Sequence, residues 1–398
     1  MAFVTLDDPR KRIPLGTFSL WVLGFRPFYL LAATFAALAV PVWVAVLAGV
    51  VSLPMPGLLW HAHEMLFGFV AAVIVGFLFT AGRNWTGLPT PAGVPLAALA
   101  LIWLGGRIAM AFDGGVAAAV IDLIFLPLAA IALGRVLLRA GSVRNYFLPL
   151  LLMVMATANL AFHLGRLGAI ALNPIAALHF MLSLVIVLET TIGGRVIPSF
   201  TANGLRSVSG LRQWQHPWLN TAAIASTAVA LLLWSIEAPA VIGAPVAALA
   251  ALLQLLRTLG WNPGATLRVP LLWILHAGHL WIPLGLTLIA ISDITALPPS
   301  APVHALAIGA TGSLIIGMIT RTALGHTGRK LETGGVEAAT YGLIQCAAVA
   351  RVVTLVAWPL AALAGIHIAA TAWSLAFLLY LWRYAPWLVY SRADGQPG

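Results

Sequence analysis

Charge is scarce in this chain: Asp, Glu, Lys and Arg make up only 8% of its 398 residues, whereas soluble proteins carry about 25%. Hydrophobic residues make up 61% of the sequence. A soluble domain would not bury so much apolar surface, so the composition predicts a protein whose main solvent is lipid. The formal net charge of +10 does not indicate nucleic-acid binding, because the basic residues are scattered between apolar runs.

Cysteine is almost absent, since Cys346 is the single one in the chain. One cysteine excludes an internal disulfide, an iron–sulfur cluster held by several thiolates, and covalent haem attachment through a Cys-x-x-Cys-His motif. Any haem is therefore expected to be bound non-covalently by other side chains.

Long apolar runs dominate what is present. A run of about 20 apolar residues is long enough to cross a bilayer as a helix, and the sequence predicts an all-α bundle of about twelve such spans. The chain 1–398 is then one integral membrane domain, with a leader at 1–16 and a tail at 385–398. The spans are expected near 27–50, 58–81, 94–112, 116–138, 146–166, 172–193, 217–236, 239–257, 268–291, 301–320, 337–360 and 362–384.

The basic residues predict the orientation of these spans. If both chain ends lie on one side, all but three of the 21 lysines and arginines fall on that side. The exceptions are Arg107, Arg166 and Arg351. By the positive-inside rule, both the leader and the tail are expected in the cytoplasm.

A weak internal repeat relates spans two, six and ten, which all run from outside to inside. Each carries histidine near its outer end and an arginine near its inner end, followed by a polar loop. The spacing of four spans suggests three four-helix units around a pseudo-threefold axis. The alternative is a chance coincidence of interfacial histidines with positive-inside arginines. The residues concerned are His61, His63, His179 and His304, with Arg83, Arg195 and Arg321.

Most of the ten histidines fall inside predicted spans. Imidazole is costly in hydrocarbon without a partner, and imidazoles at matching depth on several helices form metal sites in bundles. His216 and His326 lie on the cytoplasmic side. For His163, a solvated role is an alternative of at least equal weight to a ligand role. For the others, the alternative is an interfacial cap or interhelical hydrogen bonds. The candidate metal ligands are His61, His63, His179, His276, His279 and His304.

Spacing separates these candidates into pairs of two kinds. His61 and His63 point about 200° apart on a helix, so they would serve two sites, or one would be a ligand and the other a polar group that supports it. His276 and His279 are three residues apart and share one face. Among the charged residues, Glu64 and Glu189 are candidates for proton transfer in the membrane. The alternative for Glu189 is a buried ion pair with Arg195.

Several longer strings resemble the NnrS family. They are WHAHEMLFGF at 60–69, NWTG at 84–87, GGRVIP at 193–198, WIPLG at 281–285 and RTALGHTGR at 321–329. The resemblance implies a twelve-span protein of the bacterial inner membrane that contains haem. Copper is the candidate for a second metal. It also implies a link to denitrification and to defence against nitric oxide.

Under this resemblance the expected activity is reduction of two nitric oxide molecules to nitrous oxide and water at a haem b. The electron donor would be a quinol or a periplasmic cytochrome or cupredoxin. The alternatives are a haem-based nitric oxide sensor and a transporter, although no pair of six-span halves with broken helices supports transport. The expected haem-binding residues are His63, His179, His304 and His279, with Arg107, Arg166 and Arg351 as partners of the propionates.

Overall fold

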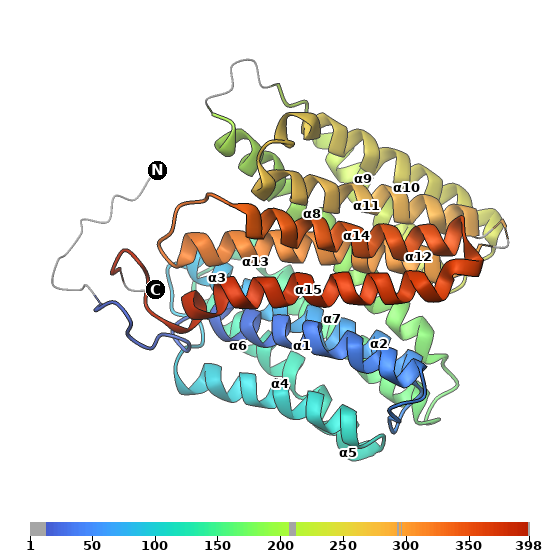
Figure 1. Cartoon of the computed structure of the whole chain (residues 1–398), viewed down its shortest axis with the longest axis horizontal. Helices are drawn as coiled ribbons and strands as arrows, with labels where there is room; N and C mark the ends of the chain where they lie inside the picture. The colour runs from blue at the N-terminus through green and yellow to red at the C-terminus, as the bar shows by residue number, and fades with distance from the viewer. Residues whose placement is uncertain (1–12, 207–211, 293, 296, 397–398) are drawn as a thin grey trace.

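The computed structural model describes residues 13–206, 212–292, 294–295 and 297–396, so most of the predicted leader lies outside the described residues. Within these ranges, twelve helical segments are long and apolar enough to cross a membrane. They run side by side as one bundle (Figure 1). The predicted all-helical fold with twelve spans is confirmed.

Seven spans are single helices, one is a pair of helices in line, and two contain a turn of π-helix. The fifth and the last begin with short 3₁₀ turns, η3 (Val143–Asn145) and η6 (Pro359–Ala361). Spans one to six are α1 (Phe25–Leu47), α2–η2–α3 (Gly57–His63, Glu64–Val70, Ala71–Thr86), α4 (Val94–Phe112), α5–α6 (Val116–Leu123, Phe125–Arg139), α7 (Phe147–Arg166) and α8 (Pro174–Gly204). Spans seven to twelve are α9 (Pro217–Ser235), α10 (Ala240–Gly260), α11 (Pro270–Ser292), α12–η5–α13 (Ser300–His304, Ala305–Gly312, Ser313–His326), α14 (Gly335–Val356) and α15 (Ala362–Val389).

Four helices continue beyond their predicted ends at 81, 193, 320 and 384. They end instead at Thr86, Gly204, His326 and Val389. The prediction stopped each of these spans within two residues of an arginine, but arginine is compatible with helix at the edge of a membrane. The tail predicted at 385–398 accordingly begins in the last turn of α15.

The packing of the helices repeats every four spans. The first span of each unit packs on the second: α1 on α3, α7 on α8, and α11 on η5 and α13. The third packs on the fourth: α4 on α5, α9 on α10, and α14 on α15. The fourth packs on the first span of the next unit, and α15 lies beside α1 to close the ring (Figure 1). This pattern supports the three four-helix units suggested by the sequence.

Two corresponding spans carry the same irregularity. In span two the π-helical turn η2 begins directly after His63, and in span ten η5 begins directly after His304. A π-helical turn redirects the side chains around it and is frequent at functional sites. The carbonyl of Gly68 in η2 accepts a hydrogen bond from the indole of Trp103 at 3.0 Å.

The two ends of the bundle differ in charge. We call the end where α3, α8 and α13 finish the basic end, because Arg83, Arg195 and Arg321 lie in their last turns or near them. The other is the opposite end. The amide of Ile13 bonds to the carbonyl of Gly395 at 2.9 Å, so the described chain begins and finishes in one place. Twelve spans, an even number, return the chain to the end of the bundle where its first span begins.

Candidate functional site

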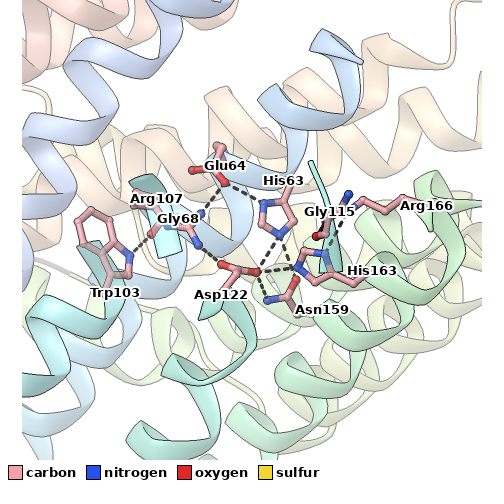
Figure 2. Close-up of polar contacts among 10 residues, drawn as sticks. All are labelled: His63, Glu64, Gly68, Trp103, Arg107, Gly115, Asp122, Asn159, His163 and Arg166. Atoms are coloured by element: carbon pink, nitrogen blue, oxygen red, sulfur yellow. Dashed lines mark hydrogen bonds and ion pairs between the residues drawn. The ribbon is translucent and has the colours of Figure 1, made fainter. Parts of the chain in front are cut away.

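A buried polar network lies near the opposite end, where α2, η2, α4, α5 and α7 meet (Figure 2). Asp122 is at its centre, and we call it the Asp122 network. All members except Arg166 are almost completely buried. The seven side chains are His63, Glu64, Arg107, Asp122, Asn159, His163 and Arg166.

Arg107 joins the two carboxylates of this network. Its Nη1 donates to Glu64 Oε1 at 2.6 Å, and its Nη2 contacts Asp122 Oδ1. A buried carboxylate without a cation would be strongly destabilising. The guanidinium contacts both groups but balances only one of their two negative charges. Gly68 leaves room for it, because a Cβ there would lie 3.0 Å from Arg107 Nη1.

One face of α7 completes the environment of Asp122. Asn159 Nδ2 donates to Asp122 Oδ2 at 2.7 Å, and His163 Nε2 lies 2.9 Å from the same oxygen. Arg166 Nε donates to His163 Nδ1 at 3.0 Å, so a neutral His163 carries its proton on Nε2 and donates it to Asp122. Of the two roles left open for His163, the structure excludes the solvated one, because the residue is 1% exposed.

His63 has hydrogen-bond acceptors at both ring nitrogens. Glu64 Oε1 lies 2.9 Å from Nδ1, and Asn159 Oδ1 lies 3.0 Å from Nε2. Asp122 Oδ2 is 3.3 Å from the same Nε2. A neutral imidazole has only one N–H, so this full set of bonds requires the imidazolium form. The arrangement can therefore bind a proton between two carboxylates.

The same groups can also hold a metal ion. His63, Asp122 and His163 each offer a donor atom, and the three atoms lie within 4.8 Å of one another. Two imidazoles and a carboxylate suit copper, zinc or non-haem iron. Binding would require the histidine nitrogens to release their protons, because only an unprotonated nitrogen ligates a metal.

A second group at the opposite end contains His61, His304 and Arg351, which are close enough to interact electrostatically. The ring of His61 stacks on Trp43 at 4.3 Å between centroids, and its Nδ1 is buried with no partner in the described parts of the chain. His304 Nδ1 donates to the carbonyl of Ser300 at 2.6 Å, so the neutral ring carries its free lone pair on Nε2.

A third group lies on α11 toward the basic end. Thr258 Oγ1 donates to Gln254 O at 2.8 Å and so accepts from His279 Nδ1 at 2.7 Å. His276 Nε2 donates to Thr201 at 2.9 Å in the same manner. His279 Nε2 and His276 Nδ1 are then buried lone pairs without partners among the described residues. An imidazole with one N–H fixed and the other nitrogen free is the form that binds metals.

The glycine pair of the GGRVIP string makes room for this third group. A Cβ on Gly193 would lie 3.4 Å from Cδ2 of His279, and a Cβ on Gly194 would overlap the guanidinium of Arg257. Arg257 Nη1 donates to the carbonyl of Thr190 at 3.0 Å across the same surface. The two glycines therefore let α8 approach α10 and α11 closely.

Glu189 lines a small apolar cavity of about 100 Å³ at the centre of the bundle, which we call the central cavity. Its walls come from α1, η2, α3, α8, α11 and α13. Thr311 Oγ1 donates to Glu189 Oε2 at 3.3 Å, so the partner is this hydroxyl rather than the Arg195 of the alternative interpretation. His179 lies elsewhere on α8, stacked on Trp234 at 4.1 Å.

The expected ligands thus divide into separate groups. The structure pairs His63 with Glu64, His61 with His304, and His276 with His279, and it leaves His179 apart from all of them. Sequence reasoning did not assign Asn159 and His163 to a site. Their spacing of four residues in an apolar span was the available signal, because it places both side chains on one helix face.

The expected partners of haem propionates are mostly engaged elsewhere. Arg107 bridges Glu64 and Asp122, and Arg166 bonds to His163 and to the carbonyl of Gly114 at 2.5 Å. Within the described residues, Nη1 of Arg351 is a buried donor without a partner.

The family model for NnrS protein matches residues 19–392, nearly the whole chain. The chain belongs to the NnrS family. No curated protein matches it. For this NnrS protein, membership provides a link to nitric oxide, and the structure shows where the strings that carry the resemblance lie. The first string supplies His63 and Glu64 to the Asp122 network, and the third supplies the glycines beside His279.

Proposed function

We propose that this NnrS protein reduces nitric oxide within the membrane. In this reaction two nitric oxide molecules, two electrons and two protons give nitrous oxide and water. The central cavity is the observation that carries the proposal. Its volume of about 100 Å³ exceeds several times the roughly 10–15 Å³ that one water needs in the same measure, so it has room for two diatomic molecules. Nitric oxide is small and uncharged and can enter an apolar cavity from lipid.

Glu189 is the acidic group placed to serve this cavity. It lies among apolar walls on α8, and the hydroxyl of Thr311 is its partner. Protons must reach a buried reaction from water, and a carboxyl group at the cavity wall can hold one and release it. Several residues of the wall, including Phe77, Ile192 and Met318, also line a pocket at the basic end. We therefore assign proton delivery to Glu189, from that end.

The histidines fit the haem and copper that the family implies. His279 Nε2 and His276 Nδ1 are free lone pairs whose ring orientation is fixed by threonine hydroxyls, and they would hold the iron. His63, Asp122 and His163 would hold copper. When bound, these metals supply the electron-transfer chemistry that joins the two nitrogen atoms. Electrons would come from a quinol or from a periplasmic cytochrome or cupredoxin.

The orientation belongs to the same proposal. The basic end would face the cytoplasm of the bacterial inner membrane by the positive-inside rule. The Asp122 network would then lie toward the periplasm, and Glu189 would take protons from the cytoplasmic side.

A turnover measurement tests the proposal. Purified protein is mixed anaerobically with an artificial reductant and excess isotopically labelled nitric oxide, and nitrous oxide is measured by mass spectrometry. We expect many equivalents of nitrous oxide per protein. Uptake of one equivalent without nitrous oxide would contradict turnover and identify a nitric oxide-binding protein instead.

A further inference from the structure

A second, larger pocket lies at the basic end, and we call it the basic pocket. Its volume is about 560 Å³, within the range of about 300–1,000 Å³ typical of sites for drug-sized ligands. The ends of α3, α8 and α13 meet around it, which are the corresponding ends of spans two, six and ten. The NWTG, GGRVIP and RTALGHTGR strings therefore share one location. Its lining includes the polar residues Asn84 and Asn145 and the aromatic residues Trp85 and Phe200.

The charge of the basic pocket is of one sign. Arg144, Arg195 and Arg321 line it together with His326, and no carboxylate is among the lining residues. In the parts of the chain that the structure describes, none of these arginines has an ion-pair partner. Arg195 is close enough to Arg144 to be repelled by it. Such an uncompensated cluster attracts anions.

Arg321 is held in place without an acidic residue. Its guanidinium lies 3.7 Å from the centroid of the Phe200 ring, a cation–π contact that leaves its N–H groups available. Guanidinium groups bind carboxylates and phosphates through paired N–H donors. At the opposite end, by contrast, Arg107 and Arg166 already donate to groups of the protein itself. Among the described residues, Arg351 offers a single free Nη1 at that end, so the arginines that form a cluster able to receive a carboxylate are those of the basic pocket.

The inner part of the basic pocket is apolar. Phe77, Ile192, Val196 and Met318 line both this pocket and the central cavity, so the two spaces adjoin. A ligand with its charged group at the arginines would extend an apolar body toward the middle of the membrane. The shape and charge together define an amphipathic anion rather than a small inorganic ion.

We propose that the basic pocket binds an amphipathic anion whose carboxylate or phosphate groups are held by Arg144, Arg195 and Arg321. Two sources have this chemistry: the propionates of a porphyrin, and the headgroup of an anionic phospholipid. The proposal is independent of nitric oxide turnover, because it concerns the charge and shape of the basic pocket alone.

The test compares two probes with the same body and different charge. Full-length protein in phosphatidylcholine nanodiscs is titrated with metal-free protoporphyrin IX and with its dimethyl ester, and quenching of tryptophan fluorescence is recorded. The ester removes both carboxylates and, like the acid, needs no metal ligand. We expect the acid to bind about tenfold more tightly or better, the scale of a charged hydrogen bond. Native mass spectrometry of protein purified with phosphatidylglycerol present tests the lipid source.

Matched variants locate the effect. Arg195→Gln and Arg321→Gln should abolish the preference for the acid, or the retention of phosphatidylglycerol, whichever the wild type shows. Asn145→Asp leaves all three arginines intact and adds a negative charge to the pocket, so it should weaken the same binding if the arginine variants fail to fold. Arg139→Gln changes an exposed arginine at the basic end, outside the lining, and should have no effect. Equal binding of acid and ester with no retained phosphatidylglycerol, or an equal loss in Arg139→Gln, would overturn the proposal.

Discussion

Arg107 and Asp122 form an ion pair inside the bundle, with side chains 5% and 1% exposed. The same guanidinium contacts Glu64, so one cation serves two buried carboxylates. Removing one partner from such a group leaves uncompensated charge, which costs about 3–5 kcal/mol. We therefore expect Arg107→Gln to lower the free energy of unfolding by about that amount, measured by thermal or denaturant unfolding in detergent.

The control for this prediction removes charge from both sides. The triple variant Glu64→Gln, Arg107→Gln, Asp122→Asn leaves no buried charge among these three groups and should be more stable than Arg107→Gln alone. Arg139→Gln, at an exposed position, should behave as the wild type. If Arg107→Gln were as stable as Arg139→Gln, the carboxylates would have to be protonated or balanced by the imidazolium of His63 alone.

His279 provides the sharpest test of the iron site. Its Nε2 is a buried lone pair, and its Nδ1 is held by Thr258. We expect His279→Ala to lose haem, and Thr258→Val to keep haem with a shifted absorption spectrum, because the hydroxyl orients the ring without ligating the metal. The measurement is haem content by pyridine haemochrome together with the spectrum of the purified protein.

His216→Ala is the matched control, since that residue is exposed in the loop before α9. Variants of the histidines at the opposite end test the competing location of the iron. Retention of haem in His279→Ala and His276→Ala, combined with its loss in His63→Ala or His304→Ala, would place the iron at the opposite end. The haem should in every case extract into acidified organic solvent, because the one cysteine excludes a pair of thioether bonds.

Glu189→Gln separates binding of nitric oxide from its reduction. The amide keeps an oxygen for the hydroxyl of Thr311 but cannot release a proton. We expect spectral binding of nitric oxide to be unchanged and nitrous oxide production to fall by about 10²–10⁴-fold, the usual contribution of a proton-transferring side chain. Glu237→Gln, at an exposed position outside the central cavity lining, is the matched control and should retain turnover. Full turnover in Glu189→Gln would exclude the assigned role.

The number and type of spans could be predicted because bilayer thickness imposes a length on apolar runs. The ends of the spans could not be predicted in the same way. Arg195 and Arg321 looked like the limits of spans six and ten, yet α8 and α13 continue as helix past both of them. A charged residue at a membrane edge does not reveal whether it faces water or the wall of a pocket.

The candidate sites were only partly accessible from the sequence. The opposite directions of His61 and His63 follow from helix geometry, and the structure places them in different groups. The contact between Asp122 and His163 depends on how α5 and α7 pack, which no local pattern contains. The free nitrogen of His279 likewise depends on Thr258 from another helix.

Topology is tested by reporter fusions in loops at the two ends of the bundle. Gly141 and Gly334 lie in loops at the basic end, and Ser52 and Pro299 lie in loops at the opposite end; all four are exposed. Because basic residues are retained in the cytoplasm, alkaline phosphatase should be inactive after Gly141 and Gly334 and active after Ser52 and Pro299. Fluorescent protein fusions at the same four positions should give the reverse pattern and control for expression. Alkaline phosphatase activity at Gly334 would reverse the assigned orientation, and Glu189 would then have to take its protons from the periplasm.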